Sequence, residues 1–144
     1  MTLYLDTSSV VKLYFDEADR EDVLQMLAYA DSAATSSVTY AEARATFARR
    51  YRERGISATV FRAAKHDLDA DWPAYVLVEA AMPVCRAAGE LAERYHLRGF
   101  DAIHLASFAE LARTSPDDVE FSSFDRRLNR AAASVRRSLK RRTG

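Results

Sequence analysis

The sequence predicts one α/β domain built on a parallel sheet of four to five short strands, with helices on both faces. Two features of the chain support this prediction. Short apolar runs alternate with longer segments in which apolar residues recur at helical spacing, which is the order expected for a parallel sheet covered by helices. The 144 residues show no linker, internal repeat or low-complexity stretch, and this length suits one domain with a buried core.

The expected elements follow one another along the whole chain. Strands are expected at residues 2–5, 33–36, 75–78 and 119–122. Helices are expected at residues 8–15, 39–54, 57–71, 83–96, 101–113 and 125–133. A further helix, after a break at residues 16–19, is expected to carry Val23, Leu24, Leu27 and Ala28. Gly55 and Gly99 are expected just beyond the ends of two helices, because glycine readily takes the left-handed conformation found there.

Basic residues are unevenly distributed in a chain whose net charge is zero. From Arg126 onward the sequence holds eight Lys and Arg residues and no Asp or Glu. Such a segment could contact phosphates, or it could be a solvated and frayed terminal helix, and the sequence leaves both readings open. We expect a domain over residues 1–134, followed by a basic C-terminal tail over residues 135–144.

Cysteine content and hydropathy indicate the cell compartment in which the protein is expected. Cys85 is the only cysteine, so a disulfide framework is excluded and a reducing compartment is expected. No signal segment is recognisable, because Asp6 interrupts the only early apolar run. No stretch approaches the ~20 apolar residues that span a bilayer. We therefore expect a soluble, cytoplasmic protein without membrane contact.

Four carboxylates, those of Asp6, Glu42, Asp101 and Asp125, each open an expected helix. In a parallel sheet the strand-to-helix turns lie at one edge, so acids far apart in sequence would meet there. Like charges in a small volume repel one another unless a divalent cation lies between them. Carboxylate oxygens suit Mg²⁺ and Mn²⁺, which retain waters that can attack a phosphodiester. The four acids together therefore favour a metal-dependent hydrolytic site.

Each acid also has a structural explanation when it is taken alone. Asp6 could be a turn residue at the end of a strand. Thr39 and Glu42 have the spacing of a capping box, in which Glu42 would accept a hydrogen bond from a backbone N–H. Asp101 and Asp125 could be simple helix N-caps.

Small hydroxyl residues lie beside the first and the last acid. Ser8 and Ser123 are predicted to orient the carboxylates or hold waters near them. For Ser9 and Ser122, helix capping is the favoured interpretation. His104 is predicted to be a core residue or a support for the acids rather than a catalytic base.

Four segments, in order, resemble the motifs of PIN domains, and specifically those of the VapC-type toxin ribonucleases. They are residues 5–14, 39–42, 100–106 and 123–128. Together they span nearly the whole chain. Ser123 is a departure, because the family more often has Thr at this position, but the hydroxyl group is kept.

The resemblance implies a five-stranded or similar parallel sheet and Mg²⁺- or Mn²⁺-dependent endoribonuclease activity on RNA. It also implies a toxin restrained by a cognate VapB-type antitoxin, and a homodimer. By the same resemblance Asp6 and Asp101 hold the metal most directly, while Glu42 and Asp125 complete the cluster. The alternative is a catalytically inactive PIN-like module that binds RNA or a protein.

Overall fold

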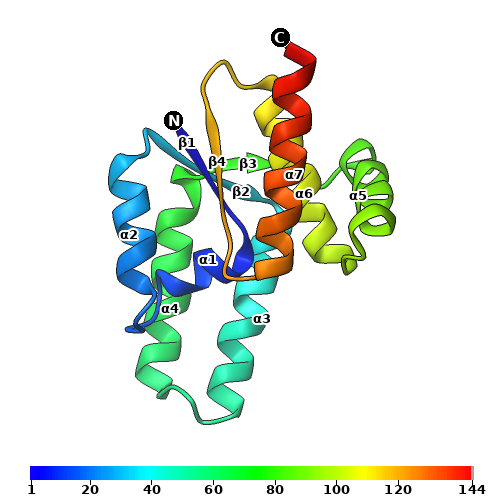
Figure 1. Ribbon diagram of the computed structural model, residues 1–144. Coiled ribbons are helices and arrows are strands. Elements are labelled where there is room, and N and C mark those ends of the chain that lie inside the picture. Colours follow the sequence, from blue (N-terminus) through cyan, green and yellow to red (C-terminus); the bar gives the residue numbers. More distant parts are fainter. Residues whose placement is uncertain (144) are drawn as a thin grey trace.

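The centre of the computed structural model, which describes residues 1–143, is a parallel sheet of four strands in the order β3-β2-β1-β4 (Figure 1). The strands are β1 (Thr2–Leu5), β2 (Ser32–Ser36), β3 (Val76–Val78) and β4 (Val119–Ser122). β1 pairs with both β2 and β4. The carboxyl end of β1, and Asp6 directly after it, therefore lies in the middle of one sheet edge. The expected α/β class and parallel sheet are confirmed.

Seven α-helices and one short 3₁₀ helix (η1) connect and follow the strands within residues 1–143. They are α1 (Thr7–Lys12), α2 (Arg20–Tyr29), α3 (Val38–Arg52), α4 (Ala58–Asp71), η1 (Trp72–Ala74), α5 (Met82–Tyr95), α6 (Gly99–Thr114) and α7 (Arg126–Thr143). The order of elements is the one expected from the sequence. None of these helices is long and apolar enough to cross a membrane.

The two faces of the sheet are covered by different helices, and β1 contributes to both. Leu3 and Leu5 are fully buried in a core cluster that draws on α1 to α4. Tyr4 points to the opposite face, where it packs with residues of α6 and α7. A strand that is buried on both faces has this apolar sequence without polar alternation. Successive residues of β1 thus tie together the two layers that carry the site.

Two boundary predictions are wrong. The last helix was expected to end near residue 133, but α7 continues to Thr143 because Val135 and Leu139 extend its apolar face onto the core. The left-handed residues after α3 and α5 are Arg54 and His96 rather than the expected glycines. Gly99 instead begins α6, so that Asp101 lies inside the first helical turn.

Candidate active site

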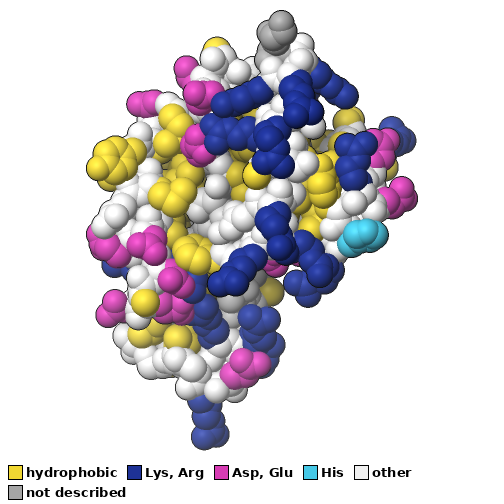
Figure 2. All heavy atoms as spheres, viewed as in Figure 1, with side chains coloured by type: hydrophobic (Ala, Val, Ile, Leu, Met, Phe, Trp, Pro, Cys, Tyr) yellow, Lys and Arg dark blue, Asp and Glu magenta, His cyan; other side chains and the backbone are white. Residues whose placement is uncertain are grey.

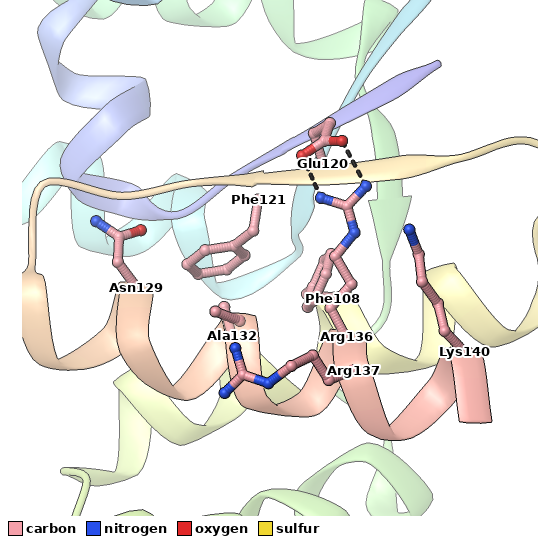
Figure 3. Close-up of a pocket in the computed structure, with 9 residues that line it drawn as sticks. Phe108, Glu120, Phe121, Asn129, Ala132, Arg136, Arg137 and Lys140 are labelled. Atoms are coloured by element: carbon pink, nitrogen blue, oxygen red, sulfur yellow. Dashed lines mark hydrogen bonds and ion pairs between the residues drawn. The ribbon is translucent and has the colours of Figure 1, made fainter. Parts of the chain in front are cut away.

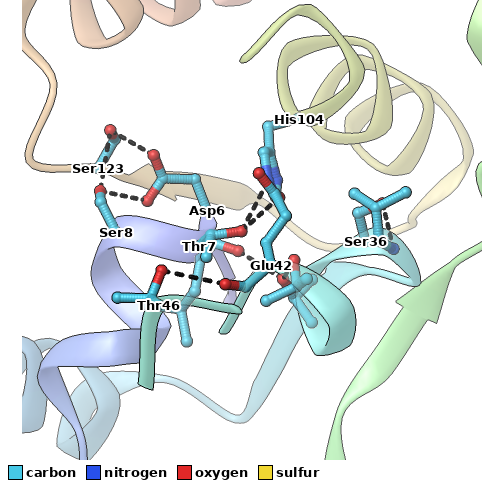
Figure 4. Close-up of polar contacts among 12 residues, drawn as sticks. Asp6, Thr7, Ser8, Ser36, Glu42, Thr46, His104 and Ser123 are labelled. Atoms are coloured by element: carbon cyan, nitrogen blue, oxygen red, sulfur yellow. Dashed lines mark hydrogen bonds and ion pairs between the residues drawn. The ribbon is translucent and has the colours of Figure 1, made fainter. Parts of the chain in front are cut away.

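Asp6 is held at the end of β1 by three hydrogen bonds (Figure 4). Its Oδ1 accepts from the backbone N–H of Ser9 at 3.0 Å, which makes Asp6 the N-cap of α1. The hydroxyl groups of Ser8 and Ser123 donate to Oδ1 and Oδ2 at 2.7 and 2.6 Å. The side chain is 4% exposed. Both carboxylate oxygens are therefore fixed by the protein, and Oδ2, which accepts one hydrogen bond, retains a lone pair for a further ligand.

Ser8 and Ser123 join Asp6 to the loop that precedes α7. Each hydroxyl group donates to Asp6 and accepts from a backbone N–H of this loop, at Phe124 for Ser8 and at Asp125 for Ser123, both at 3.0 Å. A hydroxyl can donate and accept at the same time, which a carboxylate or an ammonium group cannot do. Both serines therefore orient the Asp6 carboxylate, and their part in a metal site stays a prediction. Ser9 and Ser122 instead bond to each other, at 2.8 Å in the buried interior.

Glu42 lies on α3 and is held by two donors from other elements (Figure 4). The hydroxyl group of Thr7 donates to Oε1 at 2.6 Å, and Nε2 of His104 lies 2.9 Å from the same oxygen. Burial opposes ionisation of Glu42, but the hydrogen bonds from His104 and Thr7 outweigh it, so the pKa of Glu42 lies below its ordinary value. Glu42 is thus an ionised carboxylate with a fixed direction.

A buried tyrosine completes this second network. The Tyr4 hydroxyl lies 2.9 Å from Nδ1 of His104, and both side chains are at most 2% exposed. Burial raises the pKa of Tyr4, so its hydroxyl stays protonated and can donate to Nδ1. The hydrogen of the His104 ring then lies on Nε2, and this N–H group donates a hydrogen bond to Glu42. The hydrogen-bond partner of one ring nitrogen determines whether the other nitrogen is a donor or an acceptor.

The capping-box alternative for Glu42 is not supported. α3 begins at Val38, its N-cap Ser37 makes no side-chain capping bond, and Thr39 bonds instead to Thr35 at 2.7 Å. Glu42 points across to α1 and α6 rather than back along its own helix.

Asp101 is held differently from the first two acids. It lies in the first turn of α6 with its side chain 28% exposed, and an ion pair joins it to the exposed Arg98 at 3.7 Å. Burial raises the pKa of Asp101; Arg98 opposes this shift, whereas the negative charges of Asp125 and Asp6 reinforce it. Three carboxylates from distant parts of the sequence therefore act on one another electrostatically.

Asp125 precedes α7, and its Oδ1 accepts the backbone N–H of Leu128 at 2.9 Å. The N-cap interpretation is therefore correct for Asp125 as a contact. One oxygen serves the helix, and the second carries no hydrogen bond within residues 1–143.

The carboxylate oxygens of the four acids are chemically suited to bind a hard cation. Within residues 1–143, however, no three His, Cys, Asp or Glu side chains are already arranged as a metal-binding group. Carboxylate oxygens are the ligands that Mg²⁺ and Mn²⁺ prefer, and these ions retain waters that can bridge to more distant ligands. Burial raises the pKa of Asp101, and the negative charges of Asp125 and Asp6 add to this shift.

A cavity of about 550 Å³ opens beside these acids. Glu42 and Asp101 line it, together with Arg98 and the exposed ring of Phe100. A phosphate group entering this cavity would meet both carboxylates and the Arg98 guanidinium.

Sequence reasoning missed Tyr4 as part of the site. Tyr4 looked like an ordinary core residue of a strand. The alternation along β1 was the available signal, because it turns Tyr4 away from Leu3 and Leu5 and toward α6, where His104 lies.

Comparisons with known proteins decide the family. The model of the PIN domain matches residues 3–134. The chain belongs to the PIN domain family. It is 35% identical over 130 residues to ribonuclease VapC45 and to ribonuclease VapC49, from two strains of Mycobacterium tuberculosis, an alignment that covers 90% of this chain and 88% of each relative. It therefore stands among the VapC ribonucleases of that family.

A solved structure supports the fold. A chain in the crystal structure of VapBC2 from Rickettsia felis, bound to a DNA fragment from its promoter, superimposes with a TM-score of 0.56. The match covers 85% of this chain and 100% of that chain, at 16% sequence identity. At this identity the likeness concerns the fold alone.

Proposed function

We propose that this PIN domain is a Mg²⁺- or Mn²⁺-dependent endoribonuclease and the toxin of a VapBC-type pair. The observation that carries the proposal is the cavity lined by both Glu42 and Asp101, in a chain related to VapC ribonucleases. The negative charges of Asp125 and Asp6 act on Asp101 as well. Asp6 and Asp101 would hold the cation, and Glu42 and Asp125 would complete its surroundings. When bound, such a cation supplies an activated water and neutralises charge on the phosphate.

The residues around the acids have roles that follow from their contacts. Ser8 and Ser123 fix both oxygens of Asp6, so this ligand does not have to be ordered when the cation binds. Thr7 and His104 do the same for Glu42 and keep it ionised. Arg98 lies on the cavity wall, where it can pair with a substrate phosphate.

The partners are part of the same proposal. We infer a VapB-type antitoxin that blocks the site, and a homodimer as the form to which it binds. Both substrate RNA and the antitoxin would be met in the cytoplasm. Co-expression with a candidate VapB-type antitoxin should yield one complex on size-exclusion chromatography, with light scattering reporting the number of copies of each chain.

RNA cleavage, with and without EDTA, tests the proposed activity. Wild type should cleave RNA with Mn²⁺ or Mg²⁺ and lose this activity in EDTA, and Asp101→Asn should reduce the rate by at least about a hundredfold. Asp67→Asn, which removes an exposed carboxylate on α4, is the matched control and should cleave like wild type.

Metal binding is measured separately from activity. Mn²⁺ at about a hundredfold excess over Kd should stabilise the wild type by about 2.7 kcal/mol in thermal unfolding, because it binds the folded state alone. Asp101→Asn should lose most of this gain. Cleavage that survives EDTA would refute the metal site, and metal binding without cleavage would favour an inactive RNA- or protein-binding module.

A further inference from the structure

The outer face of α7 is basic along its whole length. The helix contains eight Lys and Arg residues and no acid. Arg126, Arg130, Arg137 and Arg141 are spaced by four, seven and four residues, which places them on one side of an α-helix. We call these four residues the basic stripe. The opposite side of α7 is buried through Leu128, Ala131, Ala132 and Val135.

All four side chains of the basic stripe are exposed, and none makes an ion pair or a hydrogen bond with the rest of residues 1–143. Arg136 behaves differently, because its guanidinium forms two hydrogen bonds with Glu120 at 2.6 and 2.5 Å (Figure 3). Arg137, the next residue, is not part of this pair. The positive charges of the basic stripe are therefore not paired with other side chains of the described residues.

The basic stripe begins at the acids and leads away from them. Arg126 directly follows Asp125, and the stripe then extends for about 22 Å along the helix, at a rise of about 1.5 Å per residue. Figure 2 shows Lys and Arg side chains gathered over α7. A hollow of about 460 Å³ between β4 and α7, lined in part by Arg137 and Lys140, adjoins the stripe (Figure 3).

Two exposed aromatic rings lie at the end of the stripe that meets the acids. Phe100 and Phe124 directly precede Asp101 and Asp125 and are 56% and 40% exposed. The Lys12 ammonium lies 5.2 Å from the centre of the Phe124 ring. Exposed rings beside cations stack on unpaired bases, whereas the bases of a duplex already stack on one another.

Together these features point to one kind of ligand. We propose that the basic stripe binds the phosphates of a single-stranded RNA segment next to the cleaved bond, while Phe100 and Phe124 stack on its bases. The proposal rests on the proposed ribonuclease function and adds the surface along which the substrate lies. A membrane is disfavoured, because a helix that lies on a bilayer inserts its apolar face, and that face of α7 is buried in the protein core.

Binding of a labelled, unstructured RNA oligonucleotide in EDTA tests this surface. The test variant is Arg130→Gln, Arg137→Gln and Arg141→Gln, since glutamine preserves helix propensity and Arg126 is left beside Asp125. The control is Arg62→Gln, Arg86→Gln and Arg94→Gln, which removes the same charge from exposed positions on α4 and α5. Fluorescence anisotropy at a series of salt concentrations gives the affinity and its salt dependence.

Loss of three phosphate contacts should reduce the slope of log K against log salt by about 2 and the affinity by roughly a hundredfold near 0.1 M salt. Replacing Phe100 and Phe124 by alanine should weaken single-strand binding by roughly tenfold per ring and leave duplex binding unchanged. The control variant should bind like wild type.

Three results would overturn the proposal: unchanged binding by the stripe variant, an equal loss in the control variant, or stripe-dependent binding to anionic vesicles but not to RNA. Cleavage of the same oligonucleotide with Mn²⁺ separates the two proposals. If the protein cleaves the oligonucleotide but its binding does not depend on the basic stripe, only the proposed binding surface is refuted. Stripe-dependent binding without cleavage supports the surface and refutes the ribonuclease.

Discussion

Asp6 and Glu42 differ from Asp101 in what surrounds their charge. Asp6 receives three hydrogen bonds and Glu42 receives two, all from side chains or backbone of the same domain. Asp101 has only the exposed Arg98 as an ion-pair partner within residues 1–143. Burial raises the pKa of Asp101, and the negative charges of Asp125 and Asp6 add to this shift. One half of the site is ordered by the protein, and the other half carries charge that an external cation would balance.

The largest expected effect on folding comes from removing the ordered half. Asp6→Ala leaves the Ser9 N–H and two serine hydroxyl groups without their acceptor, which should destabilise the protein by about 2 kcal/mol. The measurement is the urea midpoint in EDTA. Asp101→Ala is the comparison variant and should not lower the midpoint. Equal losses in the two variants would contradict the distinction between the halves.

A smaller effect is expected from the far end of the Glu42 network. Tyr4→Phe removes the donor to Nδ1 of His104 in a buried position, and we expect a loss of about 1 kcal/mol. NMR of the imidazole nitrogens gives a second readout, because the two tautomers differ in their ¹⁵N shifts. Wild type should show the proton on Nε2, and Tyr4→Phe should show a mixture. A wild-type proton on Nδ1 would contradict the network.

The smallest expected effect is a gain in stability rather than a loss. The raised pKa of Asp101 means that its protonation favours the folded state. This contribution is complete below the ordinary pKa of about 3.9 and is lost as pH rises through the raised value. In EDTA at neutral pH, Asp101→Asn should therefore be more stable than wild type, by on the order of 1 kcal/mol or less.

Thermal unfolding between acidic and neutral pH measures this difference. The two proteins should become equally stable below a pH of about 3.9, where Asp101 is protonated in both folded and unfolded states. A destabilised Asp101→Asn protein at neutral pH would show that this acid is held by the fold after all.

The order of strands and helices was predictable because short apolar runs alternate with helical apolar periodicity, and this alternation is typical of a parallel sheet covered by helices. The place of the acids at one edge followed from the same rule. The contacts of Glu42 could not be read in this way, since the capping-box spacing of Thr39 and Glu42 fits a local bond while the actual donors come from α1 and α6. The length of α7 was underestimated because its apolar residues are few and widely spaced among arginines.

The bond between Ser123 and Asp6 joins residues that are 117 positions apart. During synthesis, β1 leaves the ribosome long before β4, the strand that pairs along one of its sides. A nascent chain that ends before residue 119 lacks this strand as well as Ser123 and Asp125. The proposed nuclease site can thus be assembled only after β4 and the acid that follows it have been made, so the domain cannot be active while this part is still missing.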